Sequence, residues 1–343
     1  MSPRARTHAI DILADPFHEH RAARFAVRAT LLGGEFEFEI DSAPLRRIVA
    51  WAFARLPRHR LSPRPPRFRI RLTLAAREAA ARRGELPRTD LASAPGLLAA
   101  TRAGADLVAL CPAQRTGLIV VARDTLHSRY HVRYELIEFA VFSLAQRVQG
   151  LMPLHAACLG RDGRGILLVG ESGAGKSTAA LHWLLQGLDF LSEDSVFVEP
   201  ATLRATAIAN FLHIRRDALK HLSRSAAARI ARSPTIRRRS GAQKLEIDLR
   251  RPEFRLAPRP LRLVGCVFLS RAAARDRDLL APLGRADLAA RWQASQPYAA
   301  SQPGWISFRK RISRLPTFEL RRGSHPRDAV EALQSLLAMS SHA

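Results

Sequence analysis

The sequence predicts an α/β protein built around a phosphate-binding loop. Residues 170–177 read Gly-Glu-Ser-Gly-Ala-Gly-Lys-Ser and match the pattern G-x-x-x-x-G-K-[ST]. An apolar strand signal (GILLV, 165–169) precedes the loop, and apolar residues at helical spacing follow it over 178–185. Strand, glycine-rich loop and helix in this order place phosphate groups at a helix N-terminus, whose backbone N–H groups bind anions.

The loop residues have separate roles, which predict ATP and Mg²⁺ as ligands. The glycines allow the tight path that points backbone N–H groups inward, Lys176 reaches the β- and γ-phosphates, and the Ser177 hydroxyl ligates Mg²⁺. The chain has four lysines against 51 arginines, and one of the four stands where the loop requires a lysine. The alternative is a glycine-rich turn with an incidental lysine. The predicted nucleotide-binding residues are Gly170, Glu171, Ser172, Gly173, Ala174, Gly175, Lys176, Ser177 and Thr178.

Composition narrows the class of protein. At 343 residues and 47% hydrophobic, the chain can bury a substantial core and form two domains. Its net charge of +25 comes from dispersed arginines without interleaved aromatic residues, so it does not indicate a dedicated nucleic-acid site. The three cysteines lack metal-ligand spacing, the N-terminus lacks the apolar core of a signal peptide, and the longest apolar runs are too short to span a membrane. We expect a soluble cytoplasmic protein with reduced thiols, and leave a homo-oligomer open.

The first part of the chain predicts a smaller α+β domain over residues 1–135, of unknown role. Alternating segments predict strands at 35–40 (EFEFEI) and 68–74 (FRIRLTL), and an apolar run predicts a buried strand at 117–122. A helix is expected over 43–55, followed by a proline-rich connector at 57–66. Helical periodicity over 135–148 leads into the ATP-binding part.

Residues 136–325 form the predicted ATP-binding domain, and 326–343 a C-terminal helix. The segment 152–159 predicts a strand that pairs with 165–169 through a polar turn. Gly187 is a suitable C-cap for the helix that follows the loop. The remaining expected elements are strands at 188–191, 195–198, 244–249 and 261–269 and a helix at 328–339.

An acidic pair follows the loop at a short distance. Glu193 and Asp194 lie 17 and 18 residues after Lys176. A helix of about 11 residues descends about 16 Å from the loop, and a strand of about five residues climbs back by about the same length. The pair therefore returns to the sheet edge that holds the phosphates, where a carboxylate can ligate Mg²⁺ or accept a proton. The alternative is a solvated acidic turn.

His155 precedes Gly170 by 15 residues and completes a pattern that resembles the HPr kinase/phosphorylase family, whose nucleotide-binding core is similar to that of phosphoenolpyruvate carboxykinase. The resemblance rests on His155 and on residues 165–177 and 187–194, and extends weakly to 212–216. It implies that Asp194 transfers a proton during the reaction and ligates Mg²⁺ together with Ser177. It also implies that His155 is a supporting residue of the active site. By itself, a histidine at position 155 is more often a satisfied core histidine.

Three departures from the family pattern bear on activity. Ala156 replaces a glycine, Glu193 replaces an aspartate, and His213 stands where a metal-binding glutamate is expected. The segments associated with phosphorylase activity are not recognisable. Residues 237–244 are basic and either clamp the transferred phosphate, with Lys244 as the first candidate, or form a solvated loop.

The resemblance predicts an ATP-dependent kinase, a phosphotransferase that acts on a serine-type hydroxyl of a protein or peptide. The predicted catalytic residues are Asp194, His155, Lys176 and Glu193. Two alternatives stay open: a kinase for a small metabolite, and a nucleotide-binding regulatory module with little turnover.

Overall fold

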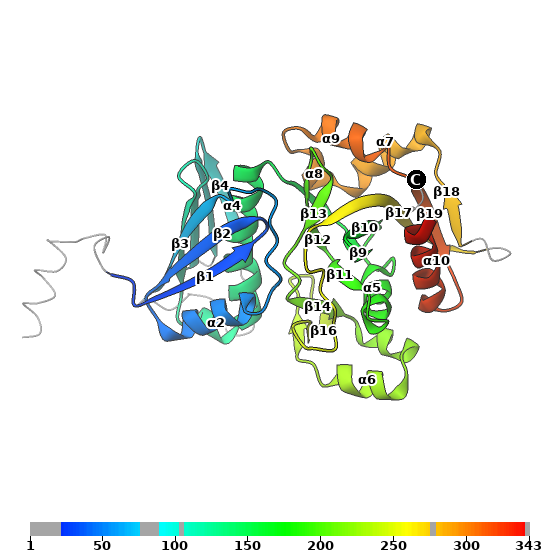
Figure 1. Ribbon diagram of the computed structural model, residues 1–343. Coiled ribbons are helices and arrows are strands. Elements are labelled where there is room, and N and C mark those ends of the chain that lie inside the picture. The colour runs from blue at the N-terminus through cyan, green and yellow to red at the C-terminus, as the bar shows by residue number, and fades with distance from the viewer. Residues whose placement is uncertain (1–21, 76–88, 103–105, 275–278, 340–343) are drawn as a thin grey trace, which may run out of the picture.

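The computed structural model describes residues 22–75, 89–102, 106–274 and 279–339. It is a mixed α/β structure with two parts that lie side by side (Figure 1). The first part contains one sheet of seven strands, and the second contains a sheet of nine strands and one of three. The general α/β prediction is confirmed.

The first sheet has the strand order β1-β2-β3-β7-β6-β5-β4, in which β2, β3 and β7 run parallel and the other neighbours antiparallel. Apolar and charged residues alternate along β2 and β3, so one sheet face is apolar and the other carries Glu–Arg pairs such as Glu37–Arg28. The strands are β1 (Phe25–Leu31), β2 (Gly34–Ile40), β3 (Arg67–Leu74), β4 (Thr89–Ala94), β5 (Leu97–Arg102), β6 (Asp106–Cys111) and β7 (Thr116–Val121).

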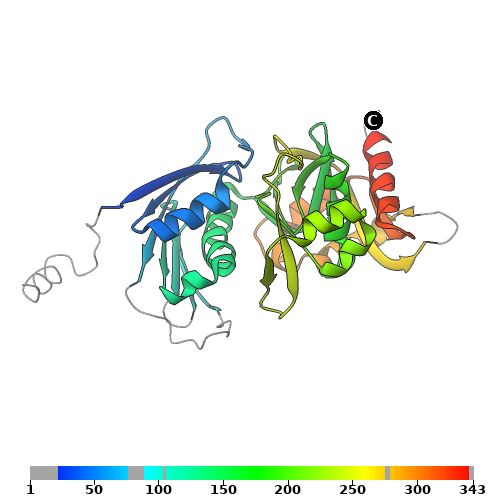
Figure 2. The same ribbon diagram turned by 90° about the horizontal axis from the view of Figure 1, so that it is seen from below.

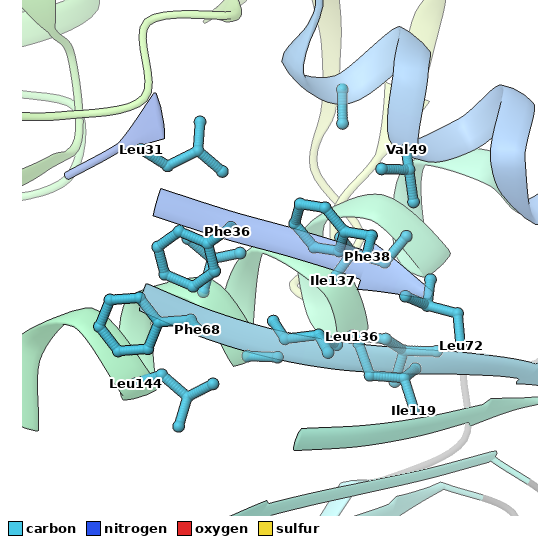
Figure 3. Packing of buried hydrophobic residues seen from close by; sticks show 14 of the residues in the cluster. Leu31, Phe36, Phe38, Val49, Phe68, Leu72, Ile119, Leu136, Ile137 and Leu144 are labelled. Carbon is cyan, nitrogen blue, oxygen red and sulfur yellow. The ribbon is translucent and has the colours of Figure 1, made fainter. Parts of the chain in front are cut away.

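Helices α2 (Ala43–Phe53) and α4 (Phe139–Gln149) cover the apolar face. Phe36, Phe38 and Phe68 stack beneath them, with ring centroids of Phe36 and Phe68 4.3 Å apart (Figure 3). Short turns η1 (Asp124–His127) and α3 (Arg129–His131) lead into a π-helical segment, η2 (Val132–Glu138), which continues into α4.

The sequence pattern grouped residues 136–149 with the phosphate-loop segment, whereas in the structure these residues pack in the core of the first sheet. Figure 2 shows α4 between the first sheet and the second part. The physical reason is that an apolar helix face matches any apolar sheet face, and helical periodicity does not say which sheet it covers. Phe142 on α4 also contacts Phe197 of the second part, with ring centroids 5.0 Å apart.

The nine-stranded sheet holds the phosphate loop at its centre. Its main path has the order β11-β9-β10-β17-β13-β12-β8, with β10 parallel to β17, and β19 and β18 continue from β17. The strands are β8 (Met152–His155), β9 (Ala157–Arg161), β10 (Arg164–Val169), β11 (Asp189–Ser192), β12 (Ser195–Glu199), β13 (Arg204–Thr206), β17 (Leu261–Ala273), β18 (Leu280–Pro282) and β19 (Thr317–Arg322).

The expected hairpin before the loop forms only in part. β9 pairs with β10 through the turn at Asp162 and Gly163, as predicted. The expected strand 152–159 is broken at Ala156, however, and its first half, β8, pairs with β12 instead. Long-range pairing therefore decides the position of His155, which lies on β8.

The third sheet has the order β14-β16-β15 and lies beside the loop helix. Its strands are β14 (Phe211–Ile214), β15 (Thr235–Arg237) and β16 (Gln243–Asp248). The helical segments of the second part are α5 (Lys176–Leu185), η3 (Arg216–His221), α6 (Arg224–Ala231), α7 (Arg285–Ser295), α8 (Pro297–Ala300), α9 (Trp305–Ile312) and α10 (Pro326–Met339).

Helix α10 forms where the C-terminal helix is expected, and residues 340–343 of that prediction lie outside the described residues. Its apolar side packs against α5 and the central strands, with Val330, Leu333 and Leu337 buried. Within the described ranges, no helix has the length and apolar character needed to cross a membrane.

The packing of Phe38 gives a test of the first core. Phe38 is fully buried and stacks on Phe53 of α2 at 5.4 Å, so Phe38→Ala removes a large apolar side chain and leaves a cavity. We expect the free energy of unfolding to fall by about 3–5 kcal/mol, measured by urea denaturation. The control Leu118→Ala, on the exposed face of β7, should cost less than about 1 kcal/mol. Equal losses would contradict this assignment of the two faces.

Candidate functional site

The phosphate loop joins the end of β10 to the start of α5. Gly173 and Gly175 have φ angles of +83° and +104°, which side chains with a Cβ rarely adopt. Gly175 is also the residue that caps α5, and it has no side chain to satisfy the first N–H groups of the helix. Backbone N–H groups at a helix N-terminus can bind an anion, and the phosphate-binding role of residues 170–178 stays a prediction.

Lys176 is buried at the start of α5 and folds back over the loop. Its Nζ donates to the carbonyl oxygens of Gly170 and Glu171, the latter at 3.2 Å. Burial lowers the pKa of Lys176, while the charges of Asp194 and Glu193 act in the opposite direction. The acidic pair therefore lies within electrostatic range of the loop lysine, which agrees with the geometry expected from the loop-to-acid spacing.

The turn that carries the acidic pair is fixed by Ser192. Its Oγ accepts hydrogen bonds from the backbone N–H groups of Asp194 (3.2 Å) and Ser195 (3.1 Å) and donates to the Ser195 carbonyl. We call residues 192–195 the acidic turn. The turn connects β11 to β12, and the strands on either side of it pair with β9 and β8.

The same antiparallel register continues across the acidic turn. Ser192 pairs with Cys158 and Ser195 pairs with His155, and the Ala156 N–H donates to the Asp194 carbonyl at 3.2 Å. His155 and Asp194 are thereby neighbours on adjacent strands. His155 Nδ1 lies 2.9 Å from Asp194 Oδ1, with the two side chains 52% and 25% exposed. The structure brings together the histidine and the aspartate that the sequence singled out.

Gln296 fixes the backbone of His155. Its side-chain oxygen accepts from the His155 N–H at 2.7 Å, and its Nε2 donates to the His155 carbonyl at 3.1 Å. Gln296 is buried between α7 and α8, 141 residues away in sequence. Sequence reasoning missed this residue, and a single glutamine between two short helices carries no local signal that could have identified it.

The electrostatic surroundings keep Asp194 ionised. Burial alone would raise its pKa, but the hydrogen bond and charge of His155 and the charges of Arg238 and Lys244 outweigh burial and hold the pKa well below its usual range. Arg238 Nη1 lies 3.6 Å from Asp194 Oδ2. Arg238 and Lys244 belong to the hairpin of β15 and β16, so the basic segment predicted from the sequence faces the site.

Glu193 has a different environment from Asp194. Its Oε1 accepts from the N–H of His213 at 2.7 Å and lies 3.1 Å from His213 Nδ1, while Oε2 is buried without a hydrogen-bond partner among the described residues. His213 Nε2 lies 3.0 Å from Glu246 Oε1. Both ring nitrogens of His213 are thus engaged by carboxylates, which leaves neither for a metal ion.

The π-helical segment η2 of the first part also reaches the site. Glu135 binds Arg239, the neighbour of Arg238, through two hydrogen bonds of 2.7 and 2.8 Å. Glu135 also contacts His131 and Arg102, at 3.0 and 3.1 Å. The first part of the chain therefore holds one end of the basic hairpin in place.

A cavity of about 470 Å³ opens beside the phosphate loop, within the size range of small-molecule sites. One wall is the loop itself, and the others are the ends of β17 and β19, η3 and the first turn of α10. His325 stands between His182 and His221, with ring centroids 5.4 and 5.6 Å away. The position and size of the cavity suit the nucleoside portion of a nucleotide whose phosphates lie on the loop.

The predicted metal ligands are the hydroxyl of Ser177 and the carboxylate of Asp194. Among the described residues no group of three or more histidine, cysteine, aspartate or glutamate side chains could hold a metal ion. Mg²⁺ in nucleotide sites typically binds one or two protein oxygens and completes its shell with phosphates and water. The donor set therefore fits Mg²⁺ that binds together with a nucleotide.

Comparison with known proteins gives no assignment: no protein-family model matches the chain, and no curated protein matches it significantly.

The Glu135 cluster predicts an acid-sensitive contribution to stability. Burial alone would raise the pKa of Glu135, but hydrogen bonds from His131 and Arg239 outweigh it and lower the pKa from 4.5 to about 2. A depressed carboxylate pKa stabilises the fold above the unfolded-state pKa, and this contribution disappears as the pH falls from about 4.5 towards 2. We expect Glu135→Gln to cost on the order of 2–3 kcal/mol near pH 7.

Urea unfolding of wild type and Glu135→Gln at several pH values measures this difference in stability. The difference should shrink steadily as the pH falls below about 4.5. The control Glu331→Gln, at an exposed position of α10, should show little difference at any pH. A Glu135→Gln deficit that does not depend on pH would contradict the ionic origin.

Proposed function

We propose that the protein is an ATP-dependent kinase of the HPr kinase type, which transfers a phosphoryl group to a serine-type hydroxyl on a protein or peptide. The observation that carries this proposal is the 2.9 Å contact between His155 Nδ1 and Asp194 Oδ1, within electrostatic range of Lys176 in the phosphate loop. The resemblance in sequence includes the same three residues.

Each part of the site has a role in this reaction. The loop N–H groups and Lys176 bind the β- and γ-phosphates, and Arg238 and Lys244 neutralise charge on the group being transferred. Mg²⁺, when bound through Ser177 and Asp194, offsets further phosphate charge. The bond from the γ-phosphorus to the bridging oxygen breaks, and a bond to the acceptor oxygen forms.

Asp194 accepts the acceptor's hydroxyl proton. Its low pKa makes it a weak base towards a free hydroxyl, but phosphoryl transfer passes through a loose transition state in which the acceptor oxygen becomes acidic as the new bond forms. An ionised carboxylate first orients the hydroxyl by a hydrogen bond and then takes its proton. His155 holds the carboxylate through Oδ1, and Oδ2, which lies 3.6 Å from Arg238 Nη1, is the oxygen that takes the proton.

Transfer of label from γ-³²P-ATP tests the proposal. Purified protein incubated with a cell lysate and Mg²⁺ should label a polypeptide at a phosphate ester that is stable to acid. Asp194→Asn should lower the rate of labelling by about 10²–10⁴-fold, because it removes the proton acceptor and keeps the shape of the side chain. The control Asp162→Asn, on the exposed turn between β9 and β10, should label at the wild-type rate.

Three outcomes count against the proposal. Equal labelling by Asp194→Asn and wild type overturns the assignment of the base. Label confined to the low-molecular-weight fraction indicates a metabolite kinase. ATP binding in calorimetry with neither transfer nor hydrolysis indicates a regulatory module.

A further inference from the structure

A buried chain of four charged side chains joins the first part of the molecule to the acidic turn. Arg133 Nη2 lies 2.7 Å from Glu246 Oε1, the same oxygen lies 3.0 Å from His213 Nε2, and His213 Nδ1 lies 3.1 Å from Glu193 Oε1. All four side chains are at most 8% exposed. We call Arg133, Glu246, His213 and Glu193 the buried charge chain.

The buried charge chain links three separate elements to the turn next to Asp194. Arg133 comes from η2 of the first part, Glu246 from β16 and His213 from β14. Glu193 ends the chain and is bonded directly to Asp194 in the backbone. The chain therefore runs from the first core to the residue that precedes the proposed base.

Stability alone does not explain the chain. Each buried charge loses several kcal/mol of hydration, and apolar residues of similar volume often replace buried ion pairs without loss. The same chain restricts the positions of its side chains, because a buried carboxylate must lie within hydrogen-bond distance of its partner. Such a chain lowers the stability of the fold but fixes the positions of its side chains. A turn that carries a reactive group requires positions fixed in this way.

Both parts of the molecule hold Arg133. Its guanidinium lies over the rings of Trp51 on α2 and Phe211 on β14, with 4.7 and 3.9 Å between Cζ and the ring centroids. Its Nε also lies 3.2 Å from Glu138 Oε1. The aromatic rings and the carboxylates hold the guanidinium against Glu246, although its Nε and Nη1 have no hydrogen-bond partner among the described residues.

The local helix geometry places these groups. η2 is a π-helical segment, a form that is rare, short and frequent at functional sites. Within this segment, Arg133 contacts Glu246 and Glu135 contacts Arg239 in the basic hairpin. One segment of the first part thus holds both the acidic turn and the hairpin that carries Arg238.

We propose that the first part of the molecule is a working part of the site, and that Arg133, Glu246 and His213 are positioning residues that fix the acidic turn and thereby Asp194. Glu193 then serves as the anchor of the turn and does not meet the substrate. This inference rests on the proposed function for its kinetic consequence, but its structural consequence can be measured without activity.

Glu246→Gln tests the chain with little change of shape. The neutral amide does not compensate the positive charges of Arg133 and His213, so the acidic turn is held less rigidly. We expect kcat for phosphoryl transfer to fall about 10- to 100-fold, the scale of a small misplacement of a reacting group, while KM for ATP changes less than about threefold because the loop is untouched. Arg133→Met, which keeps the aromatic packing, should act in the same way and serves if Glu246→Gln does not fold.

Two comparisons separate positioning from a general loss of stability. The control Glu199→Gln breaks a half-buried ion pair with Arg204 at the far end of β12 and should keep the wild-type kcat. In the Asp194→Asn background, Glu246→Gln should add little further loss, because its effect passes through Asp194. Additive losses, or an equal fall in Glu199→Gln, would overturn the positioning role.

Hydrogen exchange measured by mass spectrometry gives a readout independent of catalysis. In Glu246→Gln, peptides that cover residues 189–199 should exchange faster than in wild type, while those that cover 165–176 keep their rate. If wild type transfers no phosphate, the proposed function fails and exchange alone decides: faster exchange at the turn supports the positioning chain, and unchanged exchange overturns it.

Discussion

The pairing of β8 with β12 is the constraint on which the candidate site depends. It aligns His155 with Ser195 and so brings His155 beside Asp194. The same register extends across the acidic turn to the pair Ser192–Cys158, and a bulge between Phe190 and Ser192 then shifts it by one residue within β9 and β11. β9 in turn pairs with β10, which ends at the phosphate loop. A one-residue slip of this ladder would move the histidine away from the aspartate while leaving the loop intact.

The two carboxylates of the acidic turn have similar chemistry but different surroundings, and the surroundings give them different roles. Asp194 is partly exposed, contacts His155 and faces the basic hairpin, whereas Glu193 is buried against His213. One side of the turn is thereby available for chemistry and the other for anchoring. In the buried charge chain, the histidine at position 213 serves as a partner for two carboxylates, those of Glu193 and Glu246.

Much of the local structure could be predicted from the sequence. The loop, its flanking strand and helix, and most strands with alternating or apolar runs lie where their patterns indicate, because glycine conformation and side-chain periodicity act over a few residues. The break at Ala156 and the packing of residues 136–149 on the first sheet were not predictable in this way. Neither Gln296 nor Arg133 carries a local signal, since each acts on a partner 141 or 113 residues distant.

The sequence by itself determined a glycine-rich loop between a strand and a helix, with an acidic pair a short distance after it, because both follow from residue types and from lengths fixed by helix and strand geometry. Only the tertiary structure decided which acid lies beside His155 and the basic hairpin, what holds the histidine, and that the first part of the chain reaches the site. Those features depend on strand register and on the burial of charges, where a group far away in sequence supplies the partner that burial requires.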